Sequence, residues 1–408
     1  MNEPRVSPPE IELPAADPRL WLLDPAVTFL NHGSFGSCPR AVLDHQTRIR
    51  ERLERQPVRF LVRELEPLWD AARSELARFV GADADDLVFV SNATTGVNTV
   101  LQSLRFSAGD ELLVTNHEYN ACRNALNTVA GRAGARVVVA EIPFPFGGED
   151  DLINPILANI SARTRLALID HVTSQTGLVL PVGRLVQELS ARGIDVLVDG
   201  SHAPGMVPLD LNRLGAAYYT GNCHKWICAP KSAAFLHVRR DRQESIRPLV
   251  ISHGANSPRS DRSRFLIEFG WMGTSDPSAM LCVPEALRYM ASLLPGGWPE
   301  IMQRNHSLAV AARSLLCRTL SIPEPCPPQF LGSLASVPIP DAATATTPKS
   351  PLYLDAWQDE LLDRHQIEVP IIPWPAAPRR LLRISAQLYN ALPQYEKLAG
   401  ALRGLLVR

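Results

Sequence analysis

The sequence of 408 residues contains little lysine and carries almost no net charge. Its lysines are Lys225, Lys231, Lys349 and Lys397, and 41 basic residues nearly balance 42 acidic ones, which gives a net charge of −1. This balance argues against a nucleic acid or an anionic membrane surface as a partner held by bulk charge. Because lysine is so scarce, a lysine inside a motif points to chemistry rather than to surface charge.

Long apolar runs and closely paired cysteines are missing as well. No run reaches the roughly 20 residues that span a bilayer, and the start, MNEPRVSPPEIELPAADPRL, lacks the basic and apolar regions of a secretory signal. The seven cysteines form no C-x-x-C pair. We therefore expect a cytoplasmic protein with reduced thiols and no membrane partner, and we expect no metal site.

Short apolar strands alternate with helices over the first two thirds of the chain. Runs such as DLVFV, DELLVT, RLALIDHV and DVLVDG are separated by helical stretches such as SNATTGVNTVLQSL and EYNACRNALNTVAGRAG. Continuous Val/Leu/Ile runs between helices are typical of a parallel sheet that is covered on both faces. The predicted fold class is α/β, and functional residues are expected at the carboxyl ends of the strands.

The pattern changes after about Val283. A long helical stretch begins there, and the later strands LGSLASVPIP, HQIEVPIIPWP and RRLLRISAQLYN have the helix YLDAWQDELLDR among them. We predict an extended N-terminal segment over 1–35 and a large domain over 36–283. A small α+β domain is predicted over 284–408, together with part of the N-terminal segment.

Lys225 and Asp199 are the main candidates for catalysis. Lys225 follows a strand in YYTGNCHKWICAPK, where burial can lower its pKa enough for it to form a Schiff base. Asp199 follows the buried strand DVLVD, where a carboxylate can pair with the pyridine nitrogen of pyridoxal phosphate. His202 stands at a spacing that could reach the ring hydroxyl. The alternatives are a surface lysine, a turn aspartate and a structural histidine.

A third motif is SNATTGVNTVL, which follows the strand DLVFV. Asn92 or Ala93 ends the strand region and Thr94, Thr95 and Gly96 open a helix, and free N–H groups and hydroxyls at a helix N-terminus bind phosphate well. The motif matches neither G-x-x-x-x-G-K-[ST] nor G-x-G-x-x-G, which disfavours a nucleotide. Thr is also an ordinary helix cap.

Taken together and in this order, these motifs resemble the class V aminotransferase family of pyridoxal-phosphate enzymes. FLNHGSFGSCPR, NATTGVNTVL, DHVTSQTGLVLPV, VDGSHAPG, YYTGNCHKWICAPK and GTSDPS resemble its isopenicillin N epimerase-like branch, and the similarity runs from about Thr28 to Tyr389. The resemblance implies pyridoxal 5′-phosphate and the type I fold of its enzymes, with a mainly parallel sheet of the seven-stranded type between helices. Epimerases, carbon–sulfur lyases, cysteine desulfurases and kynureninases share this cofactor arrangement, so the reaction stays open.

The resemblance also implies roles for matching residues. Lys225, Asp199 and Tyr119 would be catalytic: Lys225 would hold the cofactor covalently, Asp199 would contact the pyridine nitrogen, and Tyr119 would cover the ring face. His202 would contact the ring oxygen. The other implied cofactor contacts are Ala93, Thr94, Thr95, Ser174, Asn222, His224 and Thr274.

Substrate binding and assembly follow from the same resemblance. Arg383 matches an arginine that clamps a substrate carboxylate, a role that suits a planar guanidinium. Asn31 and His32 resemble the family's entrance loop and are candidate substrate contacts. Thr274 matches a threonine that reaches the phosphate of a partner subunit, which implies a homodimer with shared active sites.

The leading hypothesis is an enzyme that acts at Cα or Cβ of an amino acid. After loss of the Cα proton to Lys225, reprotonation on the other face gives epimerisation, loss of a β-substituent gives a lyase, and reprotonation at the cofactor gives transamination. HQIEVPIIPWP lacks the mobile cysteine of a desulfurase, and Cys326 lies in a Pro-rich loop instead, which leaves direct β-elimination open. A non-catalytic cofactor-binding relative is disfavoured because Lys225, Asp199 and Arg383 are all present.

Overall fold

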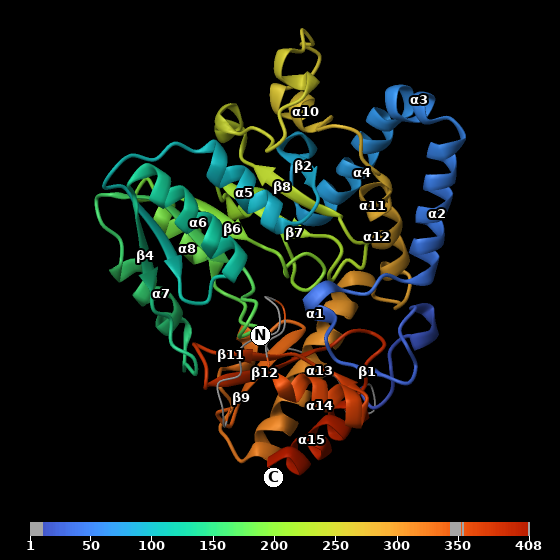
Figure 1. Ribbon diagram of the computed structural model, residues 1–408, viewed down its shortest axis with the longest axis vertical. Helices are drawn as coiled ribbons and strands as arrows, with labels where there is room; N and C mark the ends of the chain where they lie inside the picture. The colour runs from blue at the N-terminus through green and yellow to red at the C-terminus, as the bar shows by residue number, and fades with distance from the viewer. Residues whose placement is uncertain (1–10, 343–351, 353–354, 407–408) are drawn as a thin grey trace.

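A seven-stranded sheet forms the larger part of the molecule (Figure 1). The structure is a computed structural model that describes residues 11–342, 352 and 355–406. The strand order is β2-β8-β7-β6-β5-β3-β4, and β8 runs antiparallel to both of its neighbours while the other pairs are parallel. The predicted α/β class with a mainly parallel sheet is confirmed. The strands are β2 (Leu87–Val90), β3 (Glu111–Thr115), β4 (Arg136–Ala140), β5 (Thr164–Asp170), β6 (Asp195–Asp199), β7 (Tyr218–Asn222) and β8 (Ala234–Val238).

Both faces of this sheet are covered, which explains its continuous apolar strands. Val88 and Val90 of β2 pack into one cluster, while Leu87 and Phe89 pack into another on the opposite face. This alternation follows from the period of two along a strand. The first cluster includes α5 (Ala93–Ser103), α6 (Asn120–Ala133) and α10 (Arg264–Phe269), and the second includes α4 (Leu65–Val80), α7 (Glu149–Ala158) and α8 (Val182–Ser190).

Helices from both ends of the large part pack together beside the sheet. The chain runs from α2 (Arg40–Arg55) through α3 (Pro57–Arg59) and the π-helical turn η3 (Phe60–Glu64) into α4. The later helices α11 (Ser278–Leu281) and α12 (Val283–Ala291) both pack against α2 and α4. Because α12 stays with the large part, we propose that the domain boundary falls between α12 and α13, a few residues beyond the predicted Val283.

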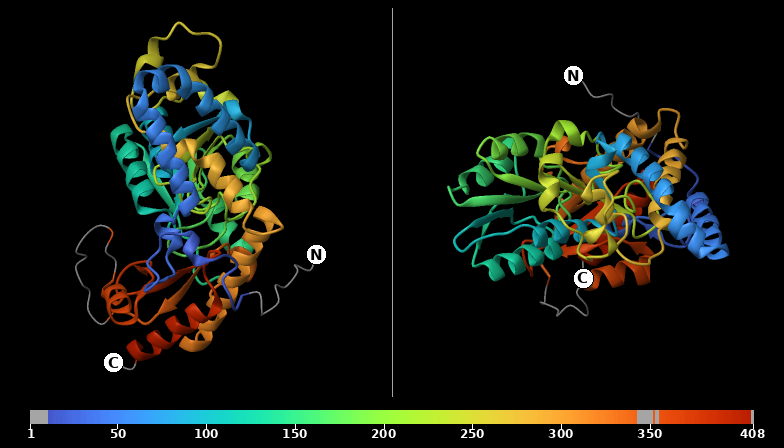
Figure 2. Two further views of the ribbon diagram at one scale, coloured as in Figure 1. Left: turned by 90° about the vertical axis from the view of Figure 1, so that its right-hand side faces the viewer. Right: turned by 90° about the horizontal axis from the view of Figure 1, so that it is seen from above.

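The C-terminal elements form a second, smaller layer at one end of the molecule (Figure 2, left). An antiparallel sheet of order β11-β12-β9 is covered by α13, which packs against both β9 and α15. β1 (Thr28–Phe29) pairs with β10, so this strand of the N-terminal segment lies against the C-terminal elements. The elements are α13 (Gly297–Leu320), β9 (Leu334–Ile339), α14 (Ala356–His365), β10 (Ile367–Glu368), β11 (Ile371–Pro373), β12 (Arg380–Ser385) and α15 (Leu392–Leu406).

Two of the longer helices, α7 and α15, are not predicted from the sequence, and neither are the short helices α1 (His32–Phe35), α9 (Leu211–Leu214) and α10. Pro155 interrupts the apolar pattern of α7, and Gly400 and Gly404 lower the helix propensity of α15. Residues 1–10 of the predicted N-terminal segment, and most of the predicted loop DAATATTPKSP, lie outside the described residues. None of the described helices combines the length and apolarity needed to cross a membrane.

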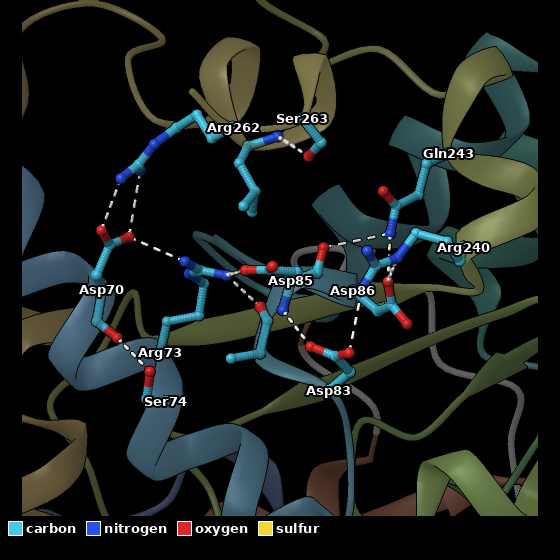
Figure 3. A network of polar contacts seen from close by, with 12 residues as sticks. Asp70, Arg73, Ser74, Asp83, Asp85, Asp86, Arg240, Gln243, Arg262 and Ser263 are labelled. Carbon is cyan, nitrogen blue, oxygen red and sulfur yellow. Dashed lines mark hydrogen bonds and ion pairs between the residues drawn. The ribbon is translucent and has the colours of Figure 1, made fainter. Parts of the chain in front are cut away.

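An ion-pair network connects the residues before β2 to α4, to the segment around Arg240 and, through Asp70, to Arg262 (Figure 3). Arg73 of α4 is 5% exposed, and it donates to the carbonyl of Ala84 and to the carboxylates of Asp70 and Asp85. On the other side, Arg240 donates to Asp86. The loop before β2, which leads into the helix that opens the site, is thereby fixed from both sides.

We expect Arg73→Met to lower the free energy of unfolding by about 3 kcal/mol, because it leaves a buried carbonyl without its donor and removes an ion pair. Urea unfolding of the purified variant measures this. Arg192→Met is the control, since Arg192 pairs with Glu188 on an exposed helix surface, and it should change stability by less than about 0.5 kcal/mol. Equal effects of the two substitutions would contradict the structural role of Arg73.

Candidate active site

The predicted catalytic residues meet at the carboxyl edge of the large sheet. Asp199 ends β6, Lys225 follows β7, and these two strands are parallel neighbours. The start of α5 follows β2 at the same sheet edge, and Arg383 reaches the site from β12 of the small part. The site therefore lies where the two parts of the chain meet.

Lys225 is held beside a histidine and forms no ion pair with an acid of the described residues. Its Nζ lies 2.9 Å from Nε2 of His202. Burial and, second, the positive charge of Arg383 lower the pKa of Lys225 to about 7. A large fraction of Lys225 is therefore a neutral amine at neutral pH, which is the nucleophilic form.

The hydrogen bonds of His202 agree with a neutral lysine. Nε1 of Trp226 donates to Nδ1 of His202 at 3.4 Å, which leaves the proton of a neutral imidazole on Nε2. This proton can be donated to Lys225 Nζ only if the amine has a free electron pair. Burial, followed by the charge of Lys225, lowers the pKa of His202 well below its usual range. His202, predicted at the ring hydroxyl, contacts Lys225 in this structure.

Asp199 is a buried carboxylate without a cationic partner. It is 1% exposed, and its Oδ1 accepts from the backbone N–H (2.9 Å) and the hydroxyl of Ser201. Its Oδ2 accepts from the thiol of Cys122 at 3.1 Å. No Lys or Arg of the described residues forms an ion pair with it. Such a carboxylate fits a ligand that brings its own N⁺–H, because an unpaired buried charge is costly.

Two further acids, Glu118 and Asp170, lie beside Asp199. Asp170 ends β5 opposite Asp199 in the sheet, and Glu118 precedes Tyr119 at the start of α6. Both are at least 95% buried, and neither oxygen of Glu118 meets a donor among the described residues. Burial and then the charges of Asp170 and Asp199 raise the pKa of Glu118 well above the usual range, and burial and then the charge of Asp199 do the same for the pKa of Asp170. Both acids therefore keep their protons to a higher pH than ordinary carboxyl groups do, which limits the negative charge that gathers beside Asp199.

Glu118, Cys122 and Asp199 are also close enough to share a metal ion, with ligand atoms within 4.8 Å of one another. Metal ligands must be deprotonated. Burial raises the pKa of the Cys122 thiol well above its usual range, and its S–H donates to Asp199. We therefore interpret Cys122 and Asp199 as a hydrogen-bonded pair with the acid of Glu118 beside it, and not as a metal centre.

The start of α5 offers a smaller phosphate site than the sequence predicts. Asn92 is the N-cap and accepts from the N–H of Thr95 at 2.8 Å. The N–H of Ala93 is taken by the side chain of Asn222 at 2.8 Å, so these two predicted cofactor contacts bind each other. Among the described residues, no hydrogen bond occupies the hydroxyl of Thr94. Thr94 remains the best-placed phosphate donor.

His224 and Tyr119 line the site from two directions. Nδ1 of His224 lies 3.1 Å from the carbonyl of Ala233, so it carries the proton, and burial lowers the pKa of His224 to about 4. Nε2 can therefore donate to a phosphate only after a second proton binds. Tyr119 stands directly before α6 and is 37% exposed, so its ring is free to cover a ligand.

Arg383 is a buried cation without a carboxylate partner. Arg383 is 3% exposed. Nη1 donates to the carbonyl of Ser174 at 2.5 Å, Nη2 donates to Oγ of Ser34 at 2.9 Å, and Nε has no partner among the described residues. Burial lowers the pKa of Arg383 to about 10. An anionic ligand would compensate this charge, as the prediction of a carboxylate clamp requires.

Asn31 and His32 do not lie at the substrate side in the way the sequence suggests. His32 is fully buried, with Nδ1 2.7 Å from the Tyr389 hydroxyl and Nε2 3.0 Å from the carbonyl of Lys225. Both ring nitrogens are therefore engaged inside the protein. Asn31 donates to Glu368 and accepts from Ser34. This geometry argues against a direct substrate contact for either residue.

Thr274 lies in an exposed loop between α10 and α11. It does not cap the following helix, because the carboxylate of Asp276 accepts from the N–H of Ser278 at 2.8 Å. Capping of the following helix, the ordinary role open to a threonine at this place, therefore does not explain Thr274. An exposed threonine is available to a second subunit.

Comparison with known proteins agrees with the resemblance. The family model described as aminotransferase class V matches residues 39–325, which is more than half of the chain. The chain belongs to the class V aminotransferase family. Its members are pyridoxal-phosphate-dependent enzymes, and the fold described above is the one that they share.

The relatives divide between two reactions. The chain is 37% identical to an isopenicillin N epimerase of Amycolatopsis lactamdurans, over 94% of this chain and 96% of that protein. It is 33% identical to a probable chloroplastic L-cysteine desulfhydrase of Arabidopsis thaliana, over 94% of this chain and 84% of that protein. A cystine C-S lyase complex with cysteine persulfide has a TM-score of 0.75 at 23% identity, covering 92% of this chain and 97% of that one. That last likeness concerns the fold alone.

Several residues of the site are not predicted from the sequence, namely Ser34, Glu118, Cys122, Asp170, Ser201 and Trp226. Glu118 and Asp170 have a signal that could reveal them, since both are acids at or shortly after the end of a buried strand. Ser34 has none, because its contact with Arg383 joins residues 349 positions apart.

We expect the raised pKa of Glu118 to make the apoprotein less stable as pH rises. The folded state keeps a proton that the unfolded state releases near pH 4.5, so the unfolding free energy falls above that pH by about 1.4 kcal/mol per pH unit for each such group. Glu118→Gln replaces a neutral acid by a neutral amide and should remove one such slope. Urea unfolding of the apoprotein between about pH 4 and 8 measures it.

Glu188→Gln, on a half-exposed helix surface, is the matched control for the loss of one carboxyl group. It should leave the wild-type slope in place. A Glu118→Gln protein with the wild-type pH dependence would mean that Glu118 is ionised in the folded state.

Proposed function

We propose that the protein binds pyridoxal 5′-phosphate and moves the Cα proton of an amino acid, with inversion at Cα as its reaction. The observation that carries the proposal is the amine of Lys225, whose pKa is lowered to about 7 and which lies between the buried, unpaired charges of Asp199 and Arg383. The relatives support inversion, since the epimerase has 37% identity and 96% of its length covered.

The residues present fit this cofactor. Asp199 is a buried anion that lacks a cation, Thr94 offers a hydroxyl at the start of α5, and Lys225 offers a neutral amine. When bound, the cofactor supplies an aldehyde for an amine and a ring that accepts the electron pair released at Cα. The residues that would hold it are Thr94, Tyr119, Ser174, Asp199, His202, His224 and Lys225, because Ala93 and Asn222 bind each other and the N–H of Thr95 is taken by Asn92.

The side chains divide the remaining work. Arg383 binds the substrate carboxylate through its guanidinium. Lys225 Nζ removes the Cα proton as a neutral amine, and His202 Nε2–H keeps that amine oriented. Asp199 holds a proton on the ring nitrogen, and Tyr119 excludes water from the ring face.

Direct β-elimination from cysteine is the second candidate, supported by the relatives described as L-cysteine desulfhydrases. Desulfurase chemistry through a protein thiol is disfavoured. Cys326 is 4% exposed, its carbonyl accepts from Arg313 at 2.8 Å, and burial raises its pKa to about 11. A buried, protonated thiol is not a mobile nucleophile. Transamination remains an alternative without a structural observation in its favour.

The test is a titration of the purified holoprotein with D- and L-amino acids, including cysteine, while the visible absorption of the bound cofactor is recorded. Chiral product analysis then assigns the reaction. Appearance of the opposite enantiomer supports inversion. Pyruvate, ammonia and sulfide from cysteine, with no enantiomer formed from any amino acid, would replace inversion by β-elimination.

Lys225→Ala should abolish borohydride-stable attachment of the cofactor and lower turnover at least about a thousandfold. Peptide mapping after reduction identifies the attached lysine. Lys231→Ala is the matched control, since Lys231 is the nearest lysine in sequence and donates to the carbonyl of Gly36. Attachment at any other lysine would show that Lys225 is the wrong residue.

We further propose a homodimer in which Thr274 completes the partner's phosphate site. Two observations support this proposal. Thr274 is exposed and does not cap the following helix. Leu249, Val250 and Ile251 form an exposed apolar run that a second chain would cover. A phosphate with about two negative charges gains from a further hydroxyl donor at an interface.

Mixing inactive Lys225→Ala and Thr274→Trp chains should restore activity. If Thr274 acts across the interface, each heterodimer has one intact site, and random exchange should give about a quarter of the wild-type activity. If Thr274 serves its own chain, every heterodimer site carries a defect and no activity returns. A fully active monomer at high dilution would also contradict the proposal.

A further inference from the structure

His32 connects the two parts of the site through its ring. A carbonyl oxygen can only accept, so Nε2 carries the proton and donates to the Lys225 carbonyl at 3.0 Å. Nδ1 is then the acceptor for the hydroxyl of Tyr389 at 2.7 Å. The amide nitrogen of Gln387, 3.3 Å from Nε2, is itself a donor and has the sulfur of Cys228 as an acceptor at 3.6 Å. The ring thus joins the Lys225 backbone to the C-terminal part.

The same helical turn, α1 (His32–Phe35), holds Arg383. Oγ of Ser34 accepts from Nη2 of Arg383 at 2.9 Å and donates to Asn31 Oδ1 at 2.5 Å. The N–H of Gly33 donates to Oγ of Ser385, which is two residues beyond Arg383 on β12. Figure 1 shows α1 at the junction of the large and small parts.

The residue that ends this turn is pressed against the Lys225 segment. Gly36 has φ +71, and a Cβ there would lie 2.1 Å from the carbonyl oxygen of His224 and 2.9 Å from Cα of Lys225. Only glycine avoids both the strained φ and this backbone clash. Lys231 adds a hydrogen bond to the carbonyl of Gly36 at 3.1 Å.

We propose that α1 is the element that sets Lys225 and Arg383 relative to each other, with His32 as the positioning residue of Lys225 and Ser34 as the positioning residue of Arg383. The role of Ser34 rests on the proposed function, because it acts through substrate binding. The role of His32 can be measured in the apoprotein.

His32 acts through its hydrogen bonds and not through a charge. Burial, and after it the nearby lysines, lower the pKa of His32 to about 3 although its bond to the Lys225 carbonyl opposes this shift. The groups that face it are the Lys225 carbonyl, Tyr389, Gln387, Cys228 and the ring of Trp226, with Lys225 and Lys231 as the nearby cations. It therefore stays neutral over the working pH range, and its replacement should not add or remove a step in a pH–rate profile.

The test compares His32→Phe with Ser34→Ala, because the first should change amide exchange and kcat and the second should change KM. His32→Phe keeps a ring of similar shape and removes both hydrogen bonds. In the apoprotein, amides of residues 223–230 should exchange about tenfold faster, because the N–H of Cys228 and His32 share the Lys225 carbonyl as acceptor. With an amino-acid substrate, kcat should fall about tenfold while KM changes less than about twofold.

Ser34→Ala removes one acceptor of Arg383 and leaves the Lys225 contacts in place. KM for an amino acid should rise about tenfold, kcat should change little, and the exchange of residues 223–230 should match the wild type. Because His32→Phe removes two buried hydrogen bonds and so lowers stability, His32→Gln serves as the second variant. Its amide nitrogen can replace Nε2 as a donor, and it should restore both exchange and kcat toward wild type.

Wild-type exchange of residues 223–230 in a folded His32→Phe protein would overturn the role of His32. A Ser34→Ala protein with lower kcat and unchanged KM would overturn the role of Ser34. If the wild type turns over no amino acid, the proposed function fails, whereas the exchange result on the apoprotein still decides whether His32 holds Lys225.

Discussion

The site depends on charges that are buried without opposite charges beside them. Asp199 and Arg383 are each at least 97% buried, and no ion pair of the described residues reaches either of them. Such charges cost several kcal/mol each, and the packed elements around the site must hold them in place. Lys225 avoids much of this cost because its lowered pKa lets the amine exist in the neutral form. A ligand with a cationic ring nitrogen, a phosphate and a carboxylate would compensate the remaining charges.

The cost of buried charge also explains the raised pKa values of Glu118 and Asp170. Three carboxyl groups in one buried cluster cannot all be ionised without cations. The raised pKa values of Glu118 and Asp170 limit the negative charge of the cluster, and the two carboxylate oxygens of Asp199 are already oriented by Ser201 and Cys122. The direction of the charge toward the ligand is thereby fixed before the ligand binds, and no reorganisation is needed there.

The sequence predicts the parts of this arrangement that are local. Asp199 and Lys225 follow buried strands, and parallel strands bring their carboxyl ends together, so their proximity follows from the pattern. The same pattern cannot tell which groups are already bonded to each other, as Ala93 and Asn222 are. The pattern also does not predict the contact between His32 and Lys225. This contact joins residues 193 positions apart and arises from packing of the N-terminal segment between two parts of the fold.

The fixed relation between Lys225 and Arg383 bears on stereochemistry. If Arg383 holds the carboxylate of a substrate, that substrate presents one face of Cα to the amine of Lys225. The other enantiomer, held by the same carboxylate contact, directs its Cα hydrogen to the opposite face. β-Elimination needs to remove a proton from one enantiomer only, whereas inversion also needs an acid on the second face. Tyr119, which is exposed and is predicted to lie over the ring, stands directly before α6 and so comes from an element separate from the Lys225 segment. The distinction between the two reactions therefore depends on the group opposite Lys225, because the residues that bind the cofactor and the carboxylate serve both equally well.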